Sequence, residues 1–194
     1  MPFNIPNPQT LDLLNARRSV KGKAMVKPGP DSGQLKQILS AAIRVPDHGK
    51  LSPWRFIVLE DDDRTKLGGL ISKGLKEEEG NVSPKVCEKM AGYATQGPTL
   101  IIAISSPVEH RAIPPFEQQL SMGAACQTLL IAAHALGFVG QWLTGWAATS
   151  ETVRTGLDIK AHERIAGFIF LGSQDSEPSE RPRPNFDAVV KWGL

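Results

Sequence analysis

The chain has 194 residues and a formal net charge of +2, from 22 Lys and Arg side chains against 20 Asp and Glu. This length predicts one domain over residues 1–194, with a core that needs neither disulfides nor a structural metal. The charge is too small to indicate nucleic acid as a partner. The chain has no apolar run near the roughly 18 residues of a membrane span. It also shows no secretory pattern at its start, so we expect a cytoplasmic protein.

The first half of the sequence predicts short helices around one strand. Apolar spacing, caps and Pro or Gly punctuation define the elements. In chain order these are a helix over 8–18 ending in Arg17-Arg18, an extended stretch over 26–30, a helix capped by Asp31 or Ser32, a strand over 54–59, a helix capped by Asp62 or Asp63, and a helix that Ser83-Pro84 begins and Gly97-Pro98 ends.

The second half predicts two strong strands and one long helix. Residues 100–105 lack polar alternation, which predicts a strand buried on both faces. Residues 117–136 carry many Gly and Ala, which predicts a central helix with close neighbours all round and Gly137 at its C-terminal end. A short strand (141–143), a short helix (150–156), a strand (164–171) and a Pro-rich, then apolar tail (181–194) follow. The pattern indicates an α+β fold, or α/β with a small sheet.

The cysteines and histidines form no metal-binding pattern. Cys87 and Cys126 are far apart, and we expect free thiols in a reducing compartment. The four histidines also lack ligand spacing, so we expect no metal. The Gly-rich dinucleotide and P-loop motifs and the serine-hydrolase elbow are missing from the sequence.

The triplet Arg17-Arg18-Ser19 is the first candidate binding motif. Two guanidinium groups and a hydroxyl at the end of a helix can hold a phosphate dianion through charge-assisted hydrogen bonds. In the alternative interpretation, the arginines lie in a last helical turn and only complement the helix dipole. The triplet by itself leaves both interpretations open.

A turn-rich segment between a helix and a strand is the second candidate. It carries Arg44, His48 and Lys50, and binding groups often concentrate on such loops. An ordinary loop with solvated charges explains the same residues.

Two later segments add aromatic and cationic side chains. Trp142 and Trp146 stand beside Gly and Thr, which suits a flat ligand, although Trp is more often a core or interface anchor. Arg181 and Arg183 either join an anion site or belong to a mobile Pro-rich tail.

Taken together and in this order, the segments resemble the nitroreductase family, most closely its small, single-domain, flavin-dependent branch. The resemblance runs along essentially the whole chain. Its pieces are the early R-R-S, the P-D-H segment that reaches P-W and F-I-V-L-E, the small-residue helix S-M-G-A-A-C-Q, the stretch L-G-F-V-G-Q-W-L-T-G, and the late strand G-F-I-F-L-G. Each piece is weak alone, whereas their joint order and spacing are specific.

The resemblance implies an α+β, nitroreductase-like fold with a small, mainly antiparallel sheet surrounded by helices, in an intertwined homodimer that holds FMN in two interface clefts. It implies that NADH or NADPH reduces nitroaromatics, quinones or similar acceptors by a ping-pong, two-electron mechanism. The chemistry then takes place at flavin N5, without a catalytic acid or base. The implied FMN contacts are Arg17, Arg18 and Ser19 at the phosphate and ribityl chain, Arg44 and His48 from the other chain, Trp142, Leu143 and Thr144 beside the flavin, and Arg181 or Arg183 at the phosphate.

In related small members of the family, the segment that matches Ala132–Gly137 is assigned to binding of the nicotinamide nucleotide. Lys50 and Ser52 depart from the family pattern, in which Asn and Gln are common. Lys only donates hydrogen bonds, whereas Asn also accepts, so Lys50 at the flavin would favour negative charge near N1 and O2. Two alternatives stay open: a flavin enzyme of another reaction, such as reductive dehalogenation or flavin fragmentation, and a flavin-binding dimer without turnover.

Overall fold

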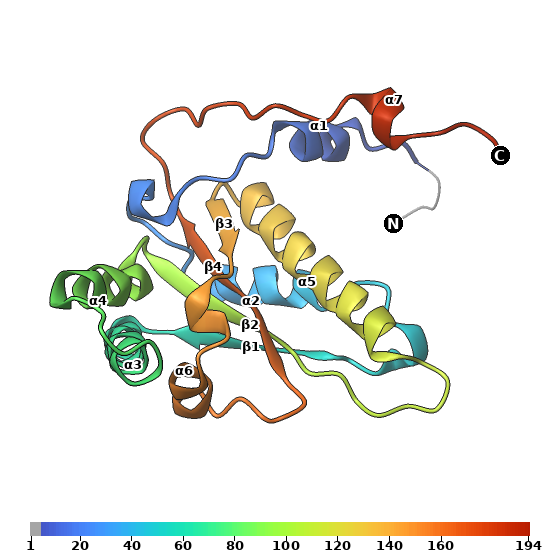
Figure 1. Ribbon diagram of the computed structural model, residues 1–194. Coiled ribbons are helices and arrows are strands. Elements are labelled where there is room, and N and C mark those ends of the chain that lie inside the picture. Colours follow the sequence, from blue (N-terminus) through green and yellow to red (C-terminus); the bar gives the residue numbers. More distant parts are fainter. Residues whose placement is uncertain (1–4) are drawn as a thin grey trace.

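A four-stranded antiparallel sheet with helices on both faces organises the chain (Figure 1), in a computed structural model that describes residues 5–194. The strands are β1 (Trp54–Leu59), β2 (Thr99–Ser105), β3 (Val139–Leu143) and β4 (Arg164–Gly172), in the spatial order β1-β2-β4-β3. Every neighbouring pair is antiparallel, so the fold is α+β. Of the two fold classes that the sequence left open, the structure selects this one.

The central strand β2 is buried at all seven positions, as predicted from its unbroken apolar run. Its side chains alternate between two cores because successive residues of a strand point to opposite faces. Ile102 and Ile104 belong to one core, whereas Ile101 and Ala103 belong to the other.

Helices cover both faces of the sheet. The helices are α1 (Pro8–Ala16), α2 (Ser32–Ala42), α3 (Asp61–Glu78), α4 (Pro84–Ala91), α5 (Pro115–Ala135), α6 (Glu151–Gly156) and α7 (Phe186–Val189), with 3-10 turns at Gly22–Ala24, His48–Lys50, Gly92–Thr95 and Trp146–Ala148. Apolar residues of α3, α4 and α6 fill the first core, and those of α2 and α5 fill the second. Predicted caps are observed: Asp31 forms a capping box with Gln34, and Ser83 caps α4.

Several predicted boundaries are wrong. The observed ends are Ala16 for α1, Asp61 with Glu60 as N-cap for α3, Ala91 for α4, and Val139 for the start of β3. After α4 the chain continues as the 3-10 turn Gly92–Thr95. The buried Arg64 donates to the carbonyls of residues 94 and 96–98, which holds this non-helical segment before β2 in place.

The long helix α5 is the longest of the described elements, but neighbours do not cover it all round. Met122, Cys126 and Leu129 are buried against the sheet and α2. Phe116 and Leu120, in contrast, are 65% and 59% exposed. The prediction of close packing all round is therefore wrong within one chain, because the sheet, α2 and α1 leave Phe116 and Leu120 uncovered.

The two cysteines are both buried free thiols, as predicted. Within residues 5–194, no helix combines the length and the apolar character needed to cross a membrane.

Candidate functional site

The triplet Arg17-Arg18-Ser19 lies just past α1, where the chain turns extended and runs beside β3. The Val20 amide donates to the Gly140 carbonyl at 3.2 Å, and Ser19 forms an isolated bridge with the same glycine. The last turn of α1 holds no basic residue, because Arg17 already has an extended ψ of 128°. The guanidinium of Arg18 nevertheless donates to the Asn15 carbonyl in the last turn of α1, so the helix-dipole interpretation holds for Arg18 and is wrong for Arg17.

Three arginines from the two ends of the chain gather at this place. Arg18 and Arg183 both donate to the Glu180 carboxylate, the latter at 3.0 Å. Burial first, and then the positive charges of Arg183 and Arg18, lower the pKa of Arg17. The folding of the chain thus brings a cluster of like charges together across 162 residues of sequence.

The arginine cluster (Arg17, Arg18 and Arg183) carries more positive charge than its carboxylate neutralises. Within residues 5–194, the guanidinium of Arg17 forms no hydrogen bond or ion pair, and Glu180 is the acid that pairs with the other two. Guanidinium groups and the nearby exposed Ser19 suit a phosphate, which accepts several charge-assisted hydrogen bonds. This set of donors is a candidate phosphate site.

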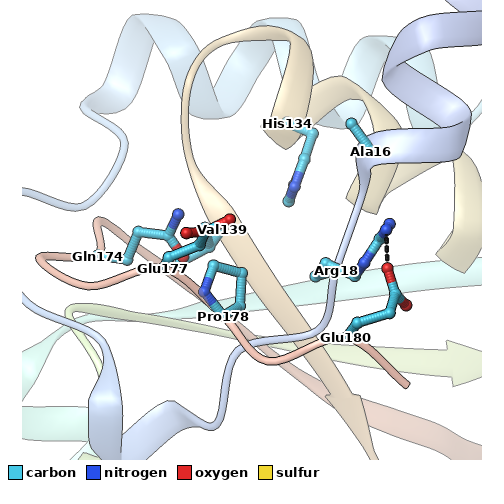
Figure 2. Close-up of a pocket in the computed structure, with 8 residues that line it drawn as sticks. All are labelled: Ala16, Arg18, His134, Val139, Gln174, Glu177, Pro178 and Glu180. Carbon is cyan, nitrogen blue, oxygen red and sulfur yellow. Dashed lines mark hydrogen bonds and ion pairs between the residues drawn. The ribbon is translucent and has the colours of Figure 1, made fainter. Parts of the chain in front are cut away.

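A pocket of about 380 Å³ opens beside the arginine cluster, between the end of α5 and the segment that follows β4 (Figure 2). Its lining residues are Ala16, Arg18, His134, Val139, Gln174, Glu177, Pro178 and Glu180. His134 projects into it from the last turn of α5, and burial together with the charge of Arg17 lowers its pKa. The lower pKa favours the neutral imidazole of His134, so this histidine adds little to the positive charge of the arginine cluster.

His134 and Glu180 both line the pocket, although no motif in the sequence points to either as a binding residue. The signal for Glu180 was its place immediately before the Arg181 motif, whereas His134 lay in a segment expected to be buried. In fact, Ala133 is buried while Ala135 and Gly137 are exposed. A contact between this segment and a nicotinamide nucleotide stays a prediction.

The outer edge of β3 continues the site away from the arginine cluster. β3 is a terminal strand, and the Gly140 carbonyl points outward to Val20. Backbone groups of alternate residues of a strand point to the same side, so those of Trp142 also face outward, and Thr144 follows directly after the strand. Leu143, in contrast, packs against the first core. The strand therefore offers backbone donors and acceptors in line with the candidate phosphate site.

The two tryptophans of this region have different roles. Trp142 is 36% exposed, and its Nε1 donates to the Ala166 carbonyl at 3.0 Å, so its ring is held at the surface. Trp146 packs against the first core and donates to Glu79 at 2.6 Å. The core-anchor interpretation therefore holds for Trp146, and Trp142 stays available to a ligand.

The loop with Arg44, His48 and Lys50 lies at the other end of α5. All three side chains are exposed, and His48 Nδ1 lies 2.7 Å from a Glu117 carboxylate oxygen. Glu117 is in the first turn of α5, whereas His134, beside the arginine cluster, is in its last turn. At 1.5 Å per residue, this separation is about 26 Å. One chain therefore does not bring this loop to the arginine cluster.

The same loop has an unusual backbone. Gly49, Lys50 and Ser52 all have positive φ, at 73°, 56° and 50°. The Asp47 carboxylate accepts from the amides of Leu51 and Ser52, which holds the turn in place. Such strained turns often occur at functional sites.

The structure thus defines an α+β protein with an arginine-rich candidate anion site at the edge of a small antiparallel sheet. The model of the Nitroreductase family matches residues 14–173. The Escherichia coli strain K12 protein named as the NAD(P)H nitroreductase YdjA is 31% identical over 169 residues, which cover 87% of this chain and 90% of that protein. A Haemophilus influenzae protein that is also named as an NAD(P)H nitroreductase is 31% identical over 173 residues, which cover 88% of this chain and 91% of that protein. The chain belongs to the nitroreductase family and is an oxidoreductase.

Solved structures show the same fold. The nitroreductase-like family protein from Bacillus cereus has a TM-score of 0.82 at 20% identity, covering 99% of this chain and 98% of that one. A Desulfovibrio desulfuricans protein, assigned by name as a nitroreductase and solved in complex with FMN, has a TM-score of 0.72 at 21% identity, covering 98% and 99%. At these identities the likeness establishes the fold.

Proposed function

We propose that the protein is an FMN-dependent enzyme that uses NADH or NADPH to reduce nitroaromatics, quinones or similar acceptors. The observation that carries this proposal is the arginine cluster, which folding places beside the open edge of β3. Family membership and the relatives' names as NAD(P)H nitroreductases support the same reaction class. We further propose that residues 1–194 form one nitroreductase-like domain.

The residues present fit FMN. Arg17 and Ser19 would hold the phosphate, with Arg18, Arg183 and, less directly, Arg181 nearby, and the β3 edge from Trp142 to Thr144 would lie along the flavin. When bound, the flavin supplies two-electron transfer between a nicotinamide donor and an acceptor, in ping-pong order. The protein's own residues bind and orient, so no side chain is assigned as a catalytic acid or base.

A homodimer would complete the site. Arg44, His48 and Lys50 lie at the far end of α5 from the arginine cluster, so we propose that they reach the FMN held by the other chain. The exposed apolar side chains of α5 and of the tail need cover, since Phe186 and Trp192 are 57% and 82% exposed. Docking on a second copy would bury both surfaces and make the two sites depend on both chains.

The reaction is tested by anaerobic mixing of the FMN-loaded protein with NADH or NADPH, followed by an acceptor. Bleaching of the flavin absorbance and reoxidation by a nitroaromatic or a quinone are expected. If neither nucleotide bleaches the flavin, the protein is a flavin-binding module without turnover. If bleaching occurs but neither acceptor class reoxidises the flavin, the alternatives with another reaction gain support.

The phosphate assignment is tested with Arg17→Ala. Loss of a charge-assisted hydrogen bond costs about 1.5–3 kcal/mol, so FMN affinity should fall roughly tenfold to a hundredfold. Fluorescence quenching measures the affinity, and Arg111→Ala, an exposed arginine outside the cluster, is the matched control. Unchanged affinity in Arg17→Ala would remove Arg17 from the site.

The shared site is tested by mixing two damaged chains. A heterodimer of Arg17→Ala and His48→Ala chains would hold one intact site and one doubly damaged site. Recovery of FMN binding at about half of the heterodimer sites is expected. A monomer in light scattering that binds FMN fully, or no recovery on mixing, would contradict the proposal.

A further inference from the structure

The side-chain carboxylate of Glu180, which belongs to the same chain, accepts hydrogen bonds from two arginines of the candidate phosphate site. The Glu180 carboxylate accepts from Arg18 and from Nη2 of Arg183, the latter at 3.0 Å. The Arg181 amide donates to the same carboxylate at 2.8 Å. Figure 2 shows Glu180 and Arg18 facing one another at the wall of the pocket.

We propose that Glu180 competes with the phosphate of FMN: the phosphate displaces its carboxylate from Arg18 and Arg183, and the segment 174–180 then moves away from the pocket, while Arg183 stays at the phosphate. This inference rests on the proposed function, because it requires the arginine cluster to bind the FMN phosphate. It assigns Glu180 a role in setting cofactor affinity and makes the segment 174–180 a strap over the site.

The displacement follows from the charges involved. A guanidinium has a fixed fork of N–H donors, and a carboxylate and a phosphate that used the same donors would repel each other at contact distance. Phosphate has the advantage, since it carries more negative charge and three strong acceptor oxygens. Glu180 is 56% exposed, so the released carboxylate returns to water at little cost.

The strap has little else to hold it. Apart from the bonds of Glu180 to Arg181 and Arg183, the one between Arg18 and Glu180 is, among the hydrogen bonds of residues 5–194, the bond that ties the segment 174–180 to the rest of the chain. The last backbone tie before it is the pairing of Ser173 with Val26. From Gln174 to Glu180 the chain is irregular and exposed except at Pro178. Loss of the Arg18–Glu180 bond therefore frees the whole segment.

The experiment compares Glu180→Gln with Glu177→Gln. Both acids line the pocket, but Glu177 forms no ion pair within the described part of the chain, so its variant is a matched control. Glu180→Gln should bind FMN about three- to tenfold more tightly, whereas Glu177→Gln should stay within about twofold of the unchanged protein. Riboflavin lacks the phosphate, so its affinity should not change in either variant.

A fluorescent label on Ser179→Cys supplies a second readout, since Ser179 is exposed and both native cysteines are buried. FMN should lower the fluorescence anisotropy of the label, because the released strap moves more freely, and riboflavin should not. Weaker or unchanged FMN binding by Glu180→Gln, or an anisotropy that FMN leaves unchanged or raises, would overturn the competition. Arg17→Ala separates the two claims: if it leaves FMN affinity unchanged, the proposed phosphate site itself fails, and if it weakens FMN binding while Glu180→Gln does not tighten it, only the role of Glu180 fails.

Discussion

A buried carboxylate far from the proposed site, Glu163, allows a quantitative test of the fold. It lies just before β4, is 3% exposed, and accepts from Nε and Nη2 of Arg55 at 2.7 Å each. The Lys160 amide donates to it as well, at 2.9 Å. The hydrogen bonds from Arg55 are the largest cause that lowers the pKa of Glu163 to about 2, against the opposing effect of burial. This pair fastens β1 to the turn that precedes β4.

The magnitude follows from proton linkage. The pKa of Glu163 is lower in the folded chain than the ordinary value of 4.5, so its contribution to stability is complete above pH 4.5 and is lost as the pH falls toward 2. At about 1.4 kcal/mol per pKa unit, the contribution is roughly 3 kcal/mol. Because the Arg55 side chain is 36% exposed, solvent screening reduces it to about 2–3 kcal/mol.

The assay is chemical denaturation of the unchanged protein and of Glu163→Gln between pH 7 and pH 2. At pH 7 the variant should be less stable by about 2–3 kcal/mol, and the difference should shrink toward zero near pH 2. Glu151→Gln, whose carboxylate is exposed, is the control and should show a small difference at every pH. Parallel curves for Glu163→Gln and the unchanged protein would refute the reasoning.

Two further predictions concern packing. Arg64→Met leaves four carbonyls without their donor, so the free energy of unfolding should fall by about 3–5 kcal/mol, and a loss under about 1 kcal/mol in urea denaturation would contradict this. Gly167→Ala would put a Cβ 2.1 Å from Trp142 Nε1, so the ring must move and stability should fall by about 1–3 kcal/mol. Gly69→Ala in α3 is its control, since that Cβ would meet no atom within 4 Å and should raise the melting temperature slightly; equal effects of the two glycine variants would refute the packing argument.

Much of the local structure was predictable from neighbouring residues. The strand over Trp54–Leu59 has the predicted bounds, and Asp31 and Ser83 cap the helices as expected, because these features depend on residues only a few positions apart. The order of weak motifs also identified the family, which the family model and the relatives confirm. The bonds from Arg64 to the segment after α4 were not predictable, since Arg64 lies about 30 residues upstream of that segment.

The candidate site required the folded chain. The sequence alone left open whether Arg17 and Arg18 complement a helix or bind an anion, and it contained no sign that Glu180 would pair with Arg18. Arg18 and Glu180 are 162 residues apart, so their pairing depends on how the fold brings the two ends of the chain together. Local sequence patterns carry no information on such long-range contacts. The distance along α5 likewise separates His48 from the arginine cluster, because a rigid helix keeps its two ends apart.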